Sequence, residues 1–193
     1  MKIILATASP HRLNAFRQLG LDFEVEGSKV KEDFDGRPEK AEELVAHLSK
    51  LKAESVAQKY REGVVIGFDG VGCFNGVILE KPTSKEEAFS RLKSMSGKNY
   101  QFYTGIHMID ASSGRVLFRV VKTEVYLRRI LDEEIKKYLE QDPQYNTYAE
   151  GYDPLGHYSC SFIEKIEGCY NNFLHSTPLA VIVEMLAEVG YKL

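Results

Sequence analysis

Apolar positions along the chain alternate between short continuous runs, which predict buried strands, and stripes with helical spacing. Strands are predicted for residues 2–5, 21–25, 64–68, 100–110, 116–127 and 161–166. Helices are predicted for residues 10–19, 41–60, 84–95, 132–139 and 177–188. The two longest runs are joined by Ser112-Ser113-Gly114, which predicts an antiparallel pair. Because strand and helix units come first and antiparallel strands follow, the order predicts one α/β domain over residues 1–193.

The first predicted strand passes directly into the first helix, and the residues between them suit an anion. Ser9 stands at the N-cap position and Pro10 at the first helical position. The unpaired N–H groups of a helix N-terminus attract anions, and Thr7, His11 and Arg12 add a hydroxyl and positive charge. The same residues also fit an ordinary strand-cap-helix unit with an exposed arginine, and the local pattern alone favours that interpretation.

The apolar run at 64–68 ends at Asp69-Gly70. This pattern predicts that Asp69 is presented in a loop at the carboxyl end of a central strand, where open α/β sheets bind ligands. A turn-forming Asp-Gly pair without a chemical role is an equal alternative. Asn75-Gly76 lies between two apolar runs and predicts a hairpin, which delivers Lys81 to a strand end ahead of Pro82.

Other charged and polar segments carry weaker signals. The polar stretch 26–39 predicts a loop, and its Glu32 is one of several acidic residues that would ordinarily be solvated. Lys50 and Lys52 fall in the second predicted helix, where a lysine ordinarily faces solvent. The stretch 142–157 is rich in Pro, Gly, Asn and Tyr, which predicts an active-site or lid loop.

Composition indicates a globular protein and disfavours several other classes. The apolar share of 44% and the charged share of 27% are typical of soluble domains. A net charge of −3 gives no support to a nucleic-acid or membrane-surface partner, and no run reaches the ~18 apolar residues of a membrane span. The three cysteines, Cys73, Cys160 and Cys169, are odd in number and contain no Cys-x-x-Cys pair. This pattern disfavours a disulfide framework or a zinc site, and a reducing cytoplasm is the simplest setting.

Five segments in a fixed order resemble the Maf family, the septum-formation-inhibitor-like nucleotide pyrophosphatases. They are LATASPHR, LSKLKA, IGFDG with its hairpin and LEKP, MSGKNYQFYTG, and FIEKIEGCYNN with STPL. The resemblance covers nearly the whole chain. It implies an α/β fold of the Maf and ITPase-like kind, in which helices flank an elongated, twisted mixed sheet and two lobes surround a cleft. A homodimer is left open as a further partner.

The resemblance also implies the roles of individual residues. Phosphate binding is implied at Thr7, Ser9, His11, Arg12 and Lys52. Catalysis is implied at Asp69, Lys81 and Glu32, with Asp69 and Glu32 holding Mg²⁺ or Mn²⁺. Several positions depart from the family pattern: His11 replaces an arginine, Gly70 a threonine and Gly156 a glutamine, and the closing Gly-Leu-Pro becomes Ser176-Thr177-Pro178. The chain is therefore identified as a divergent member whose base-reading side differs from the family.

The activity implied is hydrolysis of a nucleoside triphosphate to the monophosphate and pyrophosphate. The substrate would carry a pyrimidine or a modified or 7-methylated guanine base. The departures motivate an alternative, a catalytically weakened nucleotide-binding or regulatory protein linked to septum formation. Retention of Asp69, Glu32 and Lys81 argues against that alternative. A triphosphatase for deaminated purine nucleotides is a third interpretation, which the Asp-Gly hairpin ending in Lys-Pro disfavours.

Overall fold

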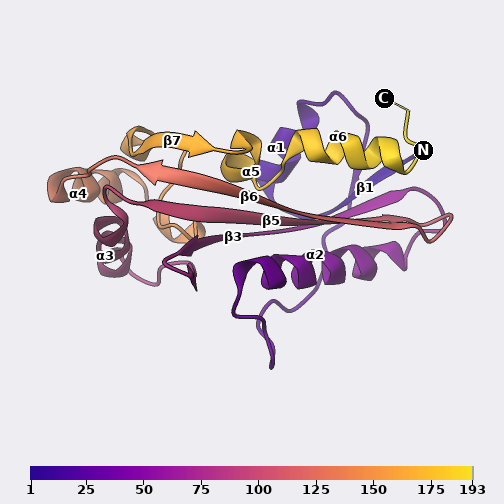
Figure 1. The fold of residues 1–193 in the computed structure, drawn as a ribbon, viewed down its shortest axis with the longest axis horizontal. Coiled ribbons are helices and arrows are strands. Elements are labelled where there is room, and N and C mark those ends of the chain that lie inside the picture. The colour runs from indigo at the N-terminus through magenta and orange to yellow at the C-terminus, as the bar shows by residue number, and fades with distance from the viewer. Residues whose placement is uncertain (193) are drawn as a thin grey trace.

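The computed structural model describes residues 1–192, in which helices cover both faces of one seven-stranded mixed sheet (Figure 1). The strands are β1 (Ile3–Ala6), β2 (Glu24–Val25), β3 (Val64–Phe74), β4 (Val77–Ile78), β5 (Asn99–Asp110), β6 (Val116–Leu127) and β7 (Ile163–Glu167). The α-helices are α1 (Pro10–Arg17), α2 (Ala41–Ala57), α3 (Lys85–Met95), α4 (Asp132–Gln141), α5 (Tyr170–His175) and α6 (Leu179–Glu188). Two short 3₁₀ turns are η1 (Tyr145–Thr147) and η2 (Tyr158–Ser161).

The sheet has the strand order β2-β1-β3-β5-β6-β7, with β4 added to one end of β3. β1 is parallel to β2 and β3, whereas β3, β5, β6 and β7 pair antiparallel. The long strands β5 and β6 run the length of the molecule and make it elongated (Figure 1). The predicted fold class, a mixed sheet flanked by helices, is therefore confirmed.

The predicted loop at Asp69-Gly70 is wrong, because β3 continues through Phe74. Every residue from Val64 to Cys73 pairs with a residue of β5, so the ladder holds Asp69 in the middle of a strand. The predicted Asn75-Gly76 hairpin is confirmed, with φ angles of 51° and 80° that suit a tight turn between β3 and β4.

Most other predicted elements are found, some with shorter and some with longer ends. β2 has two residues, α2 stops at Ala57, and α5 was not predicted. In α3, Ser84 Oγ accepts a hydrogen bond from Glu87 N at 3.1 Å and caps the helix. The inward residues of α4 are Ile135, Tyr138 and Leu139. No helix within residues 1–192 combines the length and the apolar character needed to cross a membrane.

Two glycines let α2 lie unusually close to the sheet. A Cβ atom on Gly67 of β3 would overlap the backbone of α2, with Ala53 N only 2.6 Å away. A Cβ on Gly105 of β5 would lie 2.8 Å from Ser49 Oγ and would overlap the carbonyl of Val45. The absence of side chains at both positions therefore sets the height of α2 above the sheet.

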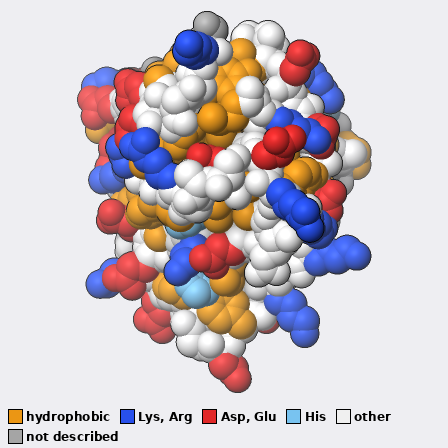
Figure 2. Space-filling model, turned by 90° about the vertical axis from the view of Figure 1, so that its right-hand side faces the viewer, with side chains coloured by type: hydrophobic (Ala, Val, Ile, Leu, Met, Phe, Trp, Pro, Cys, Tyr) orange, Lys and Arg blue, Asp and Glu red, His pale blue; other side chains and the backbone are white. Residues whose placement is uncertain are grey.

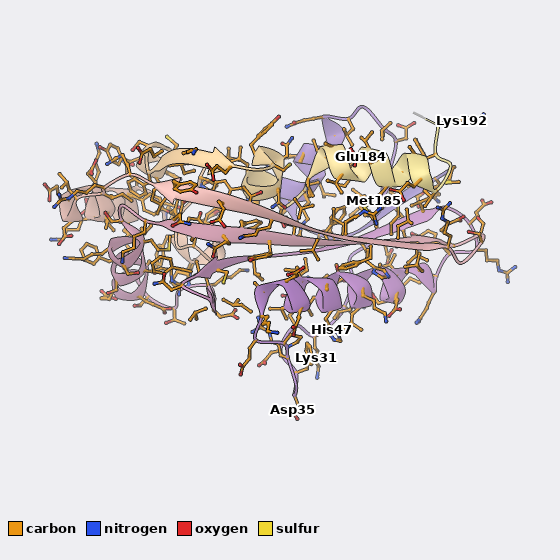
Figure 3. All side chains as sticks on the ribbon, viewed as in Figure 1. Lys31, Asp35, His47, Glu184, Met185 and Lys192 are labelled. Carbon is orange, nitrogen blue, oxygen red and sulfur yellow. The ribbon has the colours of Figure 1, made fainter. Side chains whose placement is uncertain are left out.

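Two large hydrophobic clusters lie along the sheet, one near each end, and a small third cluster joins Val56 of α2 to β1 and β3. The first contains α1 and α6 residues packed on β1, β3 and β5, including Phe16, Phe68, Ile106 and Met185. Met185 points from α6 toward the sheet, whereas Glu184 points away from it (Figure 3). The second cluster packs α3 and α4 against the other ends of β5 and β6. The two clusters are the cores of the two predicted lobes.

Charged side chains of both signs are mixed on the end of the molecule drawn in Figure 2. Basic and acidic groups alternate there, so this face has no extended area of one sign. That distribution agrees with the small net charge of −3.

We predict that Gly67→Ala destabilises the protein by about 3 kcal/mol, because the new methyl group forces α2 away from the sheet. Gly27→Ala is the matched control, since its Cβ would meet only Ala8 Cβ at 3.9 Å. Urea unfolding of the two variants measures the difference. Equal stability of both variants would contradict the close contact described for α2.

Candidate functional site

An open stretch of strand edge lies at the centre of the site. β1 ends at Ala6, opposite Gly67 of β3, and β4 joins the same strand only at Cys73. Between these points the edge of β3 pairs with no strand within residues 1–192. The turn that follows β1 and the N-terminus of α1 begin at this opening, because Ala6 is followed directly by the residues that enter the helix.

On the α2 face of the sheet, one ammonium group joins two carboxylates. Lys52 Nζ lies 2.6 Å from Asp69 Oδ1 and 2.5 Å from Glu32 Oε1. Lys52 and Asp69 are buried, whereas Glu32 is exposed. The prediction that a lysine in this helix faces solvent is confirmed for Lys50, which is exposed, and is wrong for Lys52, which is buried. Gly67 and Asp69 are two residues apart and share a strand face, so the close approach of α2 brings Lys52 onto the carboxylate.

Burial and charge act in opposite directions on the two carboxylates. Burial raises the pKa of Asp69, and the charges of Lys52 and Arg12 offset this effect only in part. Partial burial would also raise the pKa of Glu32, but the hydrogen bond and charge of Lys52, with Arg12 and Lys81, lower it. Arg12 therefore lies within electrostatic reach of both carboxylates, and Lys81 within reach of Glu32.

Arg12 is fixed from the opposite side by a residue that the sequence analysis did not select. Its Nη2 donates a hydrogen bond to Ser176 Oγ at 2.9 Å, and its Nε donates to Ser176 O at 3.3 Å. The guanidinium also lies 5.9 Å from the centre of the Phe68 ring. Burial lowers the pKa of Arg12, although Asp69 and Glu32 counteract this, and an arginine remains charged in proteins. The alternative of an exposed arginine is therefore wrong.

Ser176 requires an unusual backbone conformation and a neighbouring residue without a side chain. It has φ 50° in the left-handed region, and a Cβ on Gly70 would overlap its hydroxyl. The sequence signals for it are its place in the segment STPL, which belongs to the family resemblance, and its position immediately before Thr177-Pro178 at the start of the last helix. That position predicts a cap and gives no indication of a contact with Arg12.

The turn before α1 leaves one hydroxyl free. Ser9 is at the N-cap position as predicted, but its side chain makes no capping hydrogen bond. Instead, Thr7 Oγ1 accepts a hydrogen bond from Ser9 N at 3.2 Å, which holds the turn. Thr7 is buried at 5% exposure, so it shapes the site from within, while the Ser9 hydroxyl is available to a ligand.

A pocket of about 180 Å³ opens on the other face of the sheet, between the two hydrophobic clusters. Its polar end contains Ser9, His11, Lys81, His175 and Ser176. Its other end is lined by Phe102, Glu150, Tyr152, Phe173 and their neighbours, whereas Tyr148, from the same segment between α4 and η2, lies beside His11 with ring centres 5.9 Å apart. The predicted active-site or lid loop therefore does line the cavity.

The eight predicted site residues fall into two groups around the open strand edge. Ser9, His11 and Lys81 line the pocket, whereas Glu32, Lys52 and Asp69 lie on the α2 face and do not. Arg12 and Lys81 connect the groups, because the charges of both act on Glu32. Thr7 supports the turn that leads into the pocket.

Glu150 is the second residue that sequence analysis missed. It is 8% exposed, its Oε1 has no hydrogen-bond partner among the described residues, and burial raises its pKa to about 7. No sequence signal distinguishes it from other loop acids. Gly156, at the position where the resemblance places a glutamine, is not among the lining residues.

The carboxylates present suit a hard cation that is shared with a ligand. No group of three or more His, Cys, Asp or Glu side chains within residues 1–192 could hold a metal ion alone. Asp69 and Glu32 nevertheless share one ammonium, so both reach the same small volume. Mg²⁺ is ordinarily bound by one or two carboxylates together with substrate phosphates, and this pair fits that requirement.

We predict that Glu150→Gln changes the pH dependence of stability. The ordinary pKa of this group is 4.5 and its folded value is about 7, so between these values only the folded state retains the proton. Stability of the wild type therefore falls relative to the variant as pH rises through this window, by roughly 3 kcal/mol in total, and the difference is constant above it. Urea unfolding of both proteins across this pH range measures the difference in their free energies of unfolding. Parallel curves of this free energy against pH would refute the raised pKa.

Comparison with known proteins places the whole chain in one family. The family model described as Maf-like protein matches residues 2–189. A dTTP/UTP pyrophosphatase from Caldicellulosiruptor bescii is 35% identical over 100% of this chain and 96% of its own. One of the same name from Carboxydothermus hydrogenoformans is 36% identical over 99% of this chain and 100% of its own. Among solved structures, the Staphylococcus aureus Ham1 protein matches with a TM-score of 0.50 at 17% identity, covering 98% of this chain and 99% of that chain. The Ham1 likeness concerns the fold alone.

Proposed function

The chain belongs to the Maf-like protein family, and we propose that it hydrolyses dTTP or UTP to the monophosphate and pyrophosphate. The observation that carries this proposal is the set of charged side chains at the open edge of β3. Two carboxylates share Lys52 there, and a pocket with a polar end and an aromatic end opens beside them. Relatives at about 35% identity are named dTTP/UTP pyrophosphatases, which supports pyrimidine substrates and favours an enzyme over the binding-only alternative.

In the proposed mechanism the base occupies the aromatic end of the pocket and the triphosphate extends toward the open strand edge. The N-terminus of α1, the Ser9 hydroxyl and His11 bind phosphate oxygens at the polar end. Arg12 and Lys81 lie between pocket and carboxylates and stabilise the charge that develops as the anhydride bond breaks.

Asp69 is proposed to orient the attacking water. The water oxygen bonds to the α-phosphorus and gives up a proton to the Asp69 carboxylate, while the bond from that phosphorus to the bridging oxygen breaks and pyrophosphate leaves. Lys52 holds the carboxylate of Asp69 in place through its 2.6 Å contact. Because the close packing of α2 positions Lys52, the geometry of the reaction depends on the backbone contact at Gly67.

We propose that Mg²⁺ or Mn²⁺ assists the reaction, held by Asp69 and Glu32 together with phosphate oxygens. Such a cation neutralises phosphate charge and helps to orient the water. Because Glu32 is exposed, a cation can reach its carboxylate from solvent. Lys52 would then contact the same two carboxylates as the cation.

The proposed setting is a reducing cytoplasm. All three cysteines, Cys73, Cys160 and Cys169, are free. Free thiols, one of them exposed, are typical of proteins kept in a reducing compartment.

The direct test of the activity is pyrophosphate release from dTTP, UTP, CTP, ATP, GTP and 7-methyl-GTP. We expect release from dTTP and UTP, and a loss of about 10³-fold in Asp69→Asn because the water is no longer oriented. Asp35→Asn is the matched control, since Asp35 lies at the tip of the loop that projects beyond α2 (Figure 3). Release from no nucleotide above the Asp69→Asn background would leave the binding-only alternative as the better account.

Metal dependence has its own test. Dialysis against EDTA should abolish pyrophosphate release, and added Mg²⁺ or Mn²⁺ should restore it. Glu32→Gln should raise the metal concentration for half-maximal activity by roughly tenfold or more, because one carboxylate ligand is lost. Asp33→Asn changes the next acidic residue in the same loop and should leave that concentration unchanged. Full activity in EDTA would refute the proposed role of the cation.

A further inference from the structure

Glu150 is a buried carboxyl group that the proposed chemistry does not use. It lies in the segment between α4 and η2 and lines the aromatic end of the pocket. Its side chain is almost fully buried, and its Oε1 has no hydrogen-bond partner within residues 1–192. A buried polar atom without a partner costs about 1–3 kcal/mol. Because Oε1 packs against Gly72 and is closed to solvent, a ligand gains this energy only when the carboxyl group turns toward the pocket.

The polar groups nearest to Glu150 are all engaged elsewhere. Arg91 of α3 donates from Nη1 to the carbonyls of Glu80 and Ala149, and from Nη2 to Glu87 Oε1 at 2.8 Å. The hydroxyls of Tyr100 in β5 and Tyr152 bond to each other at 2.8 Å, inside the core. Apart from the backbone N–H of Glu150 itself, whose hydrogen bond lowers the pKa of the carboxyl group, these neighbouring groups do not bind it, and Oε1 has no partner among the described residues.

The strand beneath provides the space that Glu150 occupies. A Cβ on Gly72 of β3 would lie 2.6 Å from Glu150 Oε1 and 3.1 Å from Leu79 Cδ1. Gly72 pairs with Phe102 and lies on the same strand face as Gly70, which contacts Ser176 at the polar end of the pocket. One face of β3 thus carries the polar end of the pocket at Gly70 and the carboxyl group at Gly72.

We propose that Glu150 reads the base of the nucleotide by pairing its carboxyl group with the imide edge of uracil or thymine. This inference rests on the proposed function and assigns its substrate selection to a named residue. The imide edge presents an N–H donor at N3 beside a carbonyl acceptor at O4. A carboxylic acid presents a carbonyl acceptor beside an O–H donor, so the two edges form two parallel hydrogen bonds. Phe102 and Phe173 supply apolar surface around the ring.

The protonation state of Glu150 decides whether this pairing forms. Burial raises its pKa to about 7, with Arg91 opposing the shift. The other titratable groups that face it are Tyr100 and Tyr152, and the rest of the pocket adds His11, His175, Lys81 and Asp153. Above about pH 7 the carboxylate has two acceptors, one of which repels the O4 carbonyl of the base. Affinity for uridine nucleotides should therefore fall as the pH rises.

The experiment measures dissociation constants by calorimetry for the hydrolysis-resistant α,β-methylene analogue of UTP and for its N3-methyl derivative. The proteins are the wild type, Glu150→Gln and Glu150→Ala, each at about pH 6 and about pH 8.5. The amide of Glu150→Gln keeps one donor and one acceptor at every pH, so it acts as the conservative replacement. Glu133→Gln on the exposed surface of α4 is the control for a carboxylate far from the pocket.

We expect the wild type to bind the UTP analogue about tenfold more weakly at the higher pH than at the lower pH, beyond any change seen for Glu150→Gln. The comparison with Glu150→Gln removes the effect of titration of the triphosphate, because that effect is the same for both proteins. The wild type and Glu150→Gln should bind the N3-methyl analogue about tenfold or more weakly than the UTP analogue. Glu150→Ala should lose this preference between the two analogues. Glu133→Gln should behave as the wild type. Melting temperatures confirm that each variant is folded.

The proposal is overturned if Glu150→Ala still rejects the N3-methyl analogue, if wild type and Glu150→Gln share one pH dependence, or if the wild type binds neither analogue. Pyrophosphate release from UTP, measured on the same preparations, separates the two claims. Release with unchanged base preference rejects Glu150 and keeps the proposed function. The expected binding pattern without release supports Glu150 and rejects hydrolysis.

Discussion

The site depends on the contact between Lys52 and Asp69, and that contact depends on how closely α2 approaches the sheet. Lys52 Nζ lies 2.6 Å from Asp69 Oδ1 in a buried position, where an unpaired charge would be costly. Gly67 and Gly105 remove the side chains that would hold the helix away. Backbone packing of α2 on the sheet, rather than an attraction between charges, therefore sets the position of the charged groups.

The open edge of β3 explains how groups on opposite faces of one sheet can serve one ligand. Asp69 and Gly70 are neighbours in the strand, so their faces differ, and the site would be divided if another strand paired there. Because β1 stops at Ala6 and β4 begins further along, a phosphate chain at this edge is reachable from both sides. Arg12 is shared in the same way, since it bonds to Ser176 and acts on Glu32.

Periodicity and turn chemistry predicted most of the fold, whereas the site was predicted by resemblance. Apolar runs located the long strands, and Asn75-Gly76 located a hairpin, because both signals are local. The extension of β3 through Asp69 was missed because it depends on pairing with β5, which is distant in sequence. Lys52, Ser176 and Glu150 have roles that arise only from tertiary contacts, so local patterns favoured solvent exposure, a helix cap and an ordinary loop acid.

In the proposed reaction, water attacks the α-phosphorus at the open edge of β3. The most direct measurement is mass spectrometry of the products formed from UTP in ¹⁸O-labelled water. Our account predicts that the label appears in UMP and that pyrophosphate is unlabelled. Label in pyrophosphate or in orthophosphate would place the attack at another phosphorus and would contradict it.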